Sequence, residues 1–137
     1  VEEGILARHY RESPVNAIWE GSGNVMCLDV LRALLREADA ALAVLRDLTD
    51  QTQGLAGASD AAAFIGKAFR RPDSERVARL AVERLALLAA AAALNAVSPR
   101  HAELLAATRL AGNHAGMYGA VDLASGDVTG LLERALP

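Results

Sequence analysis

The stretch LALLAAAAAL, Leu85 to Leu94, constrains the fold of this chain more than any other segment. As a helix it would be apolar on every side, and a helix of that kind normally lies at the centre of a bundle. Ten residues are too short to cross a bilayer, which takes about 20. No segment alternates apolar and polar residues over a convincing strand length. The sequence therefore predicts an all-α fold with this helix near its centre.

The longest predicted helix, Asn24 to Thr52, has two apolar stripes rather than one. Leucine, valine and alanine recur along each stripe at steps of three and four residues. Two stripes indicate contacts on two sides, either within the bundle or at a contact between subunits. A stripe left uncovered would be a large exposed apolar patch, so we expect self-association.

Cap and turn residues predict the remaining helices. Four main helices with short ones at both ends would form one up-down bundle, a single domain that spans residues 1–137. The predicted segments are 4–12, which the Ser13-Pro14 pair ends; 24–52; 60–70, capped by Asp60; a helix capped by Asp73 or Ser74; 98–110, which starts at Ser98-Pro99; and a last short helix capped by Asp127 or Thr129.

The charges of the chain are close to balanced, with a formal net charge of -3. A domain that held nucleic acid mainly through phosphate contacts would usually be basic. Four arginines form the densest basic patch, and two acids lie among them. We interpret this patch as a solvated face, with a phosphate contact as the alternative. The patch contains Arg70, Arg71, Arg76 and Arg79, and the acids are Asp73 and Glu75.

Cysteine and histidine spacing predicts no metal site. The single cysteine, Cys27, excludes an internal disulfide, and its apolar neighbours favour buried packing. No histidine stands at metal-ligand spacing from another histidine or from the cysteine. The chain does not begin with Met and lacks the basic start and apolar run of a signal peptide. We therefore expect a piece of a longer cytoplasmic chain, without a membrane partner.

A carboxylate stands between a bulky aromatic residue and a glycine-rich turn in the stretch NAIWEGSGN, residues 16–24. Trp19 would give Glu20 a low-dielectric neighbour, and burial would raise the pKa of the Glu20 carboxyl toward the range that suits proton abstraction. The alternative is an exposed acid before a helix. Ser22 and Asn24 are good N-cap types, but free N–H groups at a helix start also hold anions or the polar edge of a nucleotide. Capping and ligand binding both stay open for these two residues.

The longer stretch YRESPVNAIWEGSGNVMCLDVLR, residues 10–32, resembles the C-terminal region of flavin-dependent acyl-CoA dehydrogenases. That family has an aromatic-Glu-Gly-Thr/Ser segment just before a long helix of its C-terminal helical domain, here Trp19-Glu20-Gly21-Ser22. The tryptophan form, followed by Gly23-Asn24 and MCLDVLR, is most similar to the alkylation-response AidB-like branch. The resemblance is close over about residues 1–36. Beyond them it consists of helix order and the ending RLAG…YG.

The resemblance implies roles for four residues. Glu20 would be the catalytic base that takes the α-proton of an acyl-CoA thioester, while the flavin N5 receives the hydride. Trp19 would line the substrate pocket, and Ser22 and Asn24 would contact FAD. Three departures matter: many members have Gln or Glu where Asn24 stands, some place the base on another helix, and Trp19 is larger than the usual Tyr.

Family members also have an N-terminal helical domain and a middle β-domain, which residues 1–137 do not contain. The resemblance therefore implies those domains of a longer parent chain as partners, together with a homo-oligomer contact. The isolated segment is expected to bind FAD weakly or not at all and to turn over no substrate. In the resembling branch acyl-CoA oxidation is weak and DNA association is ascribed to the C-terminal domain. Two alternatives thus stay open: a helical DNA-associating module and a purely structural oligomerisation bundle.

Overall fold

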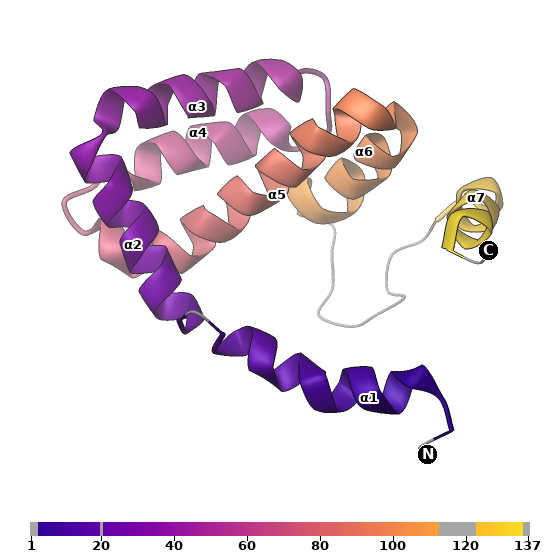
Figure 1. The fold of residues 1–137 in the computed structure, drawn as a ribbon. Coiled ribbons are helices and arrows are strands. Elements are labelled where there is room, and N and C mark those ends of the chain that lie inside the picture. Colours follow the sequence, from indigo (N-terminus) through magenta and orange to yellow (C-terminus); the bar gives the residue numbers. More distant parts are fainter. Residues whose placement is uncertain (1–2, 20, 113–122, 136–137) are drawn as a thin grey trace.

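The computed structural model describes residues 3–19, 21–112 and 123–135, and these residues form an all-α fold without strands (Figure 1). The fold-class prediction is confirmed. Two 3-10 turns, η1 and η2, and one π-helical turn, η3, join or extend the helices. In chain order the elements are α1 (Ile5–Glu12), η1 (Ser13–Ala17), α2 (Gly23–Arg36), α3 (Ala38–Gln51), α4 (Ala58–Ala68), η2 (Ser74–Val77), α5 (Ala78–Val97), α6 (Pro99–Leu105), η3 (Ala106–Leu110) and α7 (Ser125–Ala135).

Helix α5 lies at the centre of the bundle and packs against α2, α3, α4 and α6. On its inner face Ala81, Leu88 and Ala91 are completely buried. Alanine leaves room for close helix contact, so the small residues of α4 and α5 form much of the core around Ile65 and Leu88. The central position predicted from the apolar run is confirmed.

Segment Ser74–Val97 contains an 18-residue window with a mean hydropathy of 1.7, so it is long and apolar enough to cross a membrane by length and composition alone. Of the apolar window that meets this test, 22% is buried. The core helix of a soluble protein meets the same test, so the finding is weak evidence for a membrane span. The contacts of α5 with four other helices are those of a core helix.

The prediction of one long helix from Asn24 to Thr52 is wrong. The helix breaks at Glu37, whose φ of -126° and ψ of 53° are not helical, and α2 and α3 lie on either side. The Glu37 N–H still donates to the Ala33 carbonyl at 3.0 Å, and its carbonyl accepts from the Ala41 N–H at 2.9 Å. The chain thus changes direction between α2 and α3 through the single non-helical residue Glu37. Because both α2 and α3 contact α5, the break lets each of the two helices pack against the central helix (Figure 1).

Three predicted helix starts are displaced. Helix α4 begins at Ala58 after Gly57, so Asp60 lies in its first turn and is not the cap; α7 begins at Ser125, which places Asp127 in its first turn. Asp73 precedes η2, and α5 begins only at Ala78. Acids are favourable in a first turn because of the helix dipole, which explains the error of a few residues. The start predicted at Ser98-Pro99 is confirmed.

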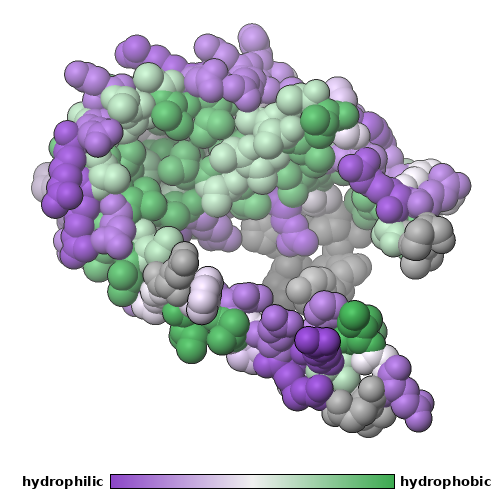
Figure 2. Space-filling model, viewed as in Figure 1, coloured by the Kyte–Doolittle hydropathy of each residue, from purple (hydrophilic) through white to green (hydrophobic). Residues whose placement is uncertain are grey.

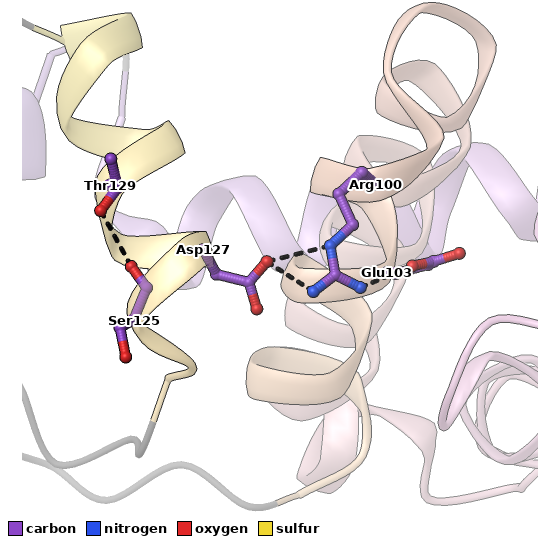
Figure 3. Close-up of polar contacts among 5 residues, drawn as sticks. All are labelled: Arg100, Glu103, Ser125, Asp127 and Thr129. Atoms are coloured by element: carbon purple, nitrogen blue, oxygen red, sulfur yellow. Dashed lines mark hydrogen bonds and ion pairs between the residues drawn. The ribbon is translucent and has the colours of Figure 1, made fainter.

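The terminal helices contribute no buried residue to the core. Helix α7 is joined to α6 by an ion pair between the exposed Arg100 and the half-buried Asp127, which Figure 3 shows. The Arg100 guanidinium donates to Asp127 Oδ1 from Nε at 3.0 Å and from Nη2 at 2.5 Å, and Nη1 donates to Glu103 at 3.1 Å. These hydrogen bonds raise the pKa of Arg100 above its ordinary value, with the Asp127 bond the largest cause.

We expect Arg100→Ala to release α7 without unfolding the bundle. Because the Arg100 side chain is exposed, its ion pair should contribute about 1 kcal/mol, and the free energy of unfolding should fall by about that amount. Limited proteolysis followed by mass spectrometry should show faster cleavage within α7. Arg79→Ala, which removes an exposed arginine elsewhere, is the control. Equal cleavage of α7 in both variants would show that the ion pair does not hold it.

Candidate functional site

The turn that precedes α2 is built by short-range backbone hydrogen bonds. After η1, the Ile18 and Trp19 N–H groups both donate to the Val15 carbonyl, at 3.0 and 2.8 Å. The Gly21 N–H donates to the Ile18 carbonyl at 3.1 Å. Gly21 has a φ of 125°, a conformation that favours glycine. The glycine of the motif is therefore explained by the backbone path of the turn.

Ser22 occupies the N-cap position of α2, but its hydroxyl makes no capping hydrogen bond. Its backbone is extended, with φ -66° and ψ 155°, and its carbonyl accepts from the Met26 N–H at 3.1 Å. Asn24 is the second residue of the helix, so it is not the cap; its side chain is exposed. The first N–H groups of any α-helix have no partner within it. Ser22 thus stands at the cap position, as the capping alternative predicts. Neither the Ser22 hydroxyl nor the Asn24 amide serves as a cap, however.

Trp19 is 69% exposed, which is unusual for an indole. Val15, Ile18, Val25 and Met26, which flank the same turn, are also exposed. We call these five residues the turn patch. Five large apolar side chains around one turn are therefore exposed in the part of the chain that the structure describes. The role of Trp19 in a substrate pocket stays a prediction.

Glu20, the predicted base, lies outside the described residues. The pKa shift predicted for its carboxyl stays a prediction, as does its role. What the structure describes are its neighbours: the exposed indole before it and the positive-φ glycine after it.

No group of His, Cys, Asp or Glu in the described residues could hold a metal ion. His101 Nδ1 lies 2.6 Å from the Ser98 hydroxyl, at the start of α6, and His114 falls outside the described residues. Cys27 is half-buried, so the packing role predicted for its thiol is only partly met.

The positive charge of the basic patch is partly neutralised by Asp73, one of the two acids that lie among its arginines. Arg71 donates two hydrogen bonds to Asp73, both at 2.9 Å, and Arg76 lies 3.9 Å from the same carboxylate. The Arg71 hydrogen bonds hold the pKa of Asp73 below its ordinary value. Two of the four arginines thus already face a carboxylate, as the solvated-face interpretation predicts.

A groove that was not predicted from the sequence lies between α2, α3, α4 and α5. It encloses about 310 Å³. Its walls come from four helices, so no local pattern could reveal it. The available signal was the presence of two apolar stripes on the predicted long helix, and residues of both line the groove. The residues that line it include Leu31, Leu42, Leu45, Ile65, Phe69 and Leu85.

Part of the chain is similar to a known protein. No family model and no solved structure matches the chain. Over 37 residues it is 70% identical to "Putative acyl-CoA dehydrogenase AidB" of Escherichia coli (strain K12). The match covers 27% of this chain and 7% of the relative. The predicted resemblance to an AidB-like acyl-CoA dehydrogenase is confirmed for that part of the chain. Because the relative is covered over so small a share, its activity as a whole does not follow from the match.

Proposed function

We propose that residues 1–137 are the C-terminal helical domain of a longer FAD-dependent oxidoreductase that resembles acyl-CoA dehydrogenases. The strongest support is the 70% identity over 37 residues to a protein that bears that name. The motif Trp19-Glu20-Gly21-Ser22 contains the residues to which the proposal assigns the proposed catalytic base and a flavin contact. In this proposal the N-terminal helical and middle β-domains of the parent chain complete the flavin site.

The side chains around the turn suit a flavin contact. The Ser22 hydroxyl is not used by the helix cap, and the Asn24 amide is exposed beside it at the start of α2. A hydroxyl, an amide and the free N–H groups of a helix start are donors that fit the polar edge of a flavin. Gly21 lets the backbone turn just before these two residues. FAD, when bound, supplies the hydride acceptor.

Glu20 is the proposed base, and Trp19 its neighbour in the substrate pocket. The carboxylate would take the α-proton of an acyl-CoA thioester and hold it as a carboxylic acid. A covering domain that buries the turn patch would also exclude water, and burial beside an indole raises the pKa of a carboxyl. The exposure of Trp19 in this chain supports such a covering domain.

Flavin retention tests the proposal. Residues 1–137 would be expressed alone and also fused after the N-terminal and middle portions of the E. coli relative. We expect the fusion to show visible flavin absorbance near one FAD per chain and the isolated segment to be colourless. Ser22→Ala and Asn24→Ala should weaken flavin retention in the fusion, whereas Ser125→Ala on α7 should not. Stoichiometric flavin in the isolated segment, or none in a folded fusion, would contradict the proposal.

Self-association is a second proposed role, supported by the turn patch and by exposed apolar residues of α1, including Ile5, Leu6 and Tyr10. Surfaces of this kind are buried in oligomers or between domains. Light scattering of residues 1–137 should then give a mass above that of the monomer.

DNA association has less support, because Arg71 and Arg76 of the basic patch face Asp73. Salt-sensitive DNA binding that falls in Arg76→Ala and Arg79→Ala would favour it.

A further inference from the structure

The groove between α2, α3, α4 and α5 has walls that are almost entirely apolar. Leucine, isoleucine and phenylalanine side chains supply most of its surface, with Leu31 from α2, Leu42 from α3 and Ile65 from α4. Figure 2 shows a broad apolar face in this part of the molecule, with hydrophilic residues along the outer edges of α2 and α3. A cavity of about 310 Å³ stands at the small end of the range for ligand pockets, about 300–1,000 Å³.

Only two polar residues line this groove, Arg70 and Ser74. They lie four positions apart, where the chain leaves α4 and enters η2. Arg71 and Arg76 face Asp73, but Arg70 has no ion pair in the described part of the chain. The Ser74 hydroxyl likewise makes no hydrogen bond there, although its backbone N–H donates to Arg71 at 3.2 Å. A cation and a hydroxyl are therefore available beside an apolar groove.

We propose that this groove binds a straight-chain aliphatic carboxylate of medium length. The tail lies among the leucines, and the carboxylate accepts hydrogen bonds from Arg70 and Ser74. Apolar walls with one cationic boundary complement a ligand that has an apolar chain and one anionic end. The inference does not rest on the proposed function, since no residue of the groove belongs to the turn before α2.

Titration of residues 1–137 with hexanoate, octanoate and decanoate, followed by calorimetry below their micelle concentrations, tests this proposal. Each methylene buried contributes about 0.8 kcal/mol, so affinity should rise about fourfold per added methylene until the groove is filled. Octanol, of equal chain length but uncharged, should bind more weakly than octanoate. Absence of saturable binding for all three acids would overturn the proposal.

Two variants locate the ligand. Arg70→Gln, an exposed position, should weaken octanoate binding about three- to fivefold, as expected for loss of an exposed ion pair, and leave octanol binding unchanged. Arg79→Gln, an exposed arginine that does not line the groove, is the matched control. Ala41→Phe adds a ring to the α3 wall and should abolish binding of both ligands.

Three results would contradict the assignment. Octanoate affinity that is equal in wild type, Arg70→Gln and Arg79→Gln would remove the role of the charge. Binding that persists in folded Ala41→Phe would place the ligand elsewhere. A dimer that forms without ligand, excludes octanoate and is lost in Ala41→Phe would identify a second copy of the chain as the occupant of the groove.

Discussion

Gly57→Ala is expected to destabilise the bundle by about 2–5 kcal/mol. Gly57 precedes α4 with a φ of 74°, a left-handed conformation that costs any other residue strain. A Cβ at this position would also lie 2.5 Å from the carbonyl carbon of Leu110 and 2.6 Å from the Ala111 nitrogen. Those are backbone atoms at the end of η3, so they cannot turn aside as a flexible side chain could. The start of α4 and the end of η3 would have to separate.

Gly54→Ala is a matched control for this prediction. Gly54 has a similar φ of 85°, but a Cβ there would meet nothing within 4 Å. Only the backbone strain remains, so the expected loss is about 1–2 kcal/mol. Urea unfolding followed by circular dichroism gives the free energy of unfolding for both variants. If Gly57→Ala proved no more destabilising than Gly54→Ala, the close approach of Gly57 to Leu110 would not exist in solution.

Glu20→Gln is expected to lower the rate of flavin reduction by an acyl-CoA about 10²- to 10⁴-fold in the fusion with the upstream domains. The amide keeps the size of the side chain but cannot take a proton at neutral pH, so flavin retention should be unchanged. Anaerobic mixing with an acyl-CoA and loss of the visible flavin absorbance measure the rate. The experiment rests on the proposed function and separates the role of the acid from the binding of the cofactor.

Glu12→Gln serves as the control for Glu20→Gln, because Glu12 is an exposed acid at the end of α1, outside the motif. It should reduce the flavin at the wild-type rate. A full rate in Glu20→Gln would clear Glu20 of the base role and point to a base on another helix. Loss of flavin in Glu20→Gln, with the fold retained, would instead indicate a part in cofactor binding.

Local patterns were enough to predict much of the fold. The all-α class, the central place of α5 and the start of α6 at Ser98-Pro99 follow from apolar periodicity and cap residues, which neighbouring positions determine. The break at Glu37 could not be predicted in this way. No glycine or proline marks it, and the apolar stripes continue through it. The packing of α2 and α3 against α5 decides the break, and that packing involves residues far apart in the chain.

The candidate site was predictable as a turn but not in its surroundings. The Gly-Ser-Gly-Asn sequence indicated a helix start, and Ser22 is the N-cap residue. The sequence also suggested a low-dielectric wall at Trp19, yet the indole is exposed because neither α1 nor any other described element covers it. The groove that Arg70 lines was beyond prediction for a related reason. Four helices meet there, and one sequence does not show how they cross.

Because α2 ends at the single non-helical residue Glu37, a small tilt of the helix at that residue displaces the motif at the other end of α2. At about 1.5 Å rise per residue, Asn24 lies roughly 20 Å along the helix from Glu37, so a tilt of about 5° there displaces the motif by nearly 2 Å. A misplacement of about 1 Å can cost about 10²-fold in rate where a reaction depends on alignment. Leu31 is the one buried side chain that α2 contributes to the core. The packing of Leu31 therefore opposes a tilt of α2 about Glu37 and helps to fix the position of the turn at the other end of the helix.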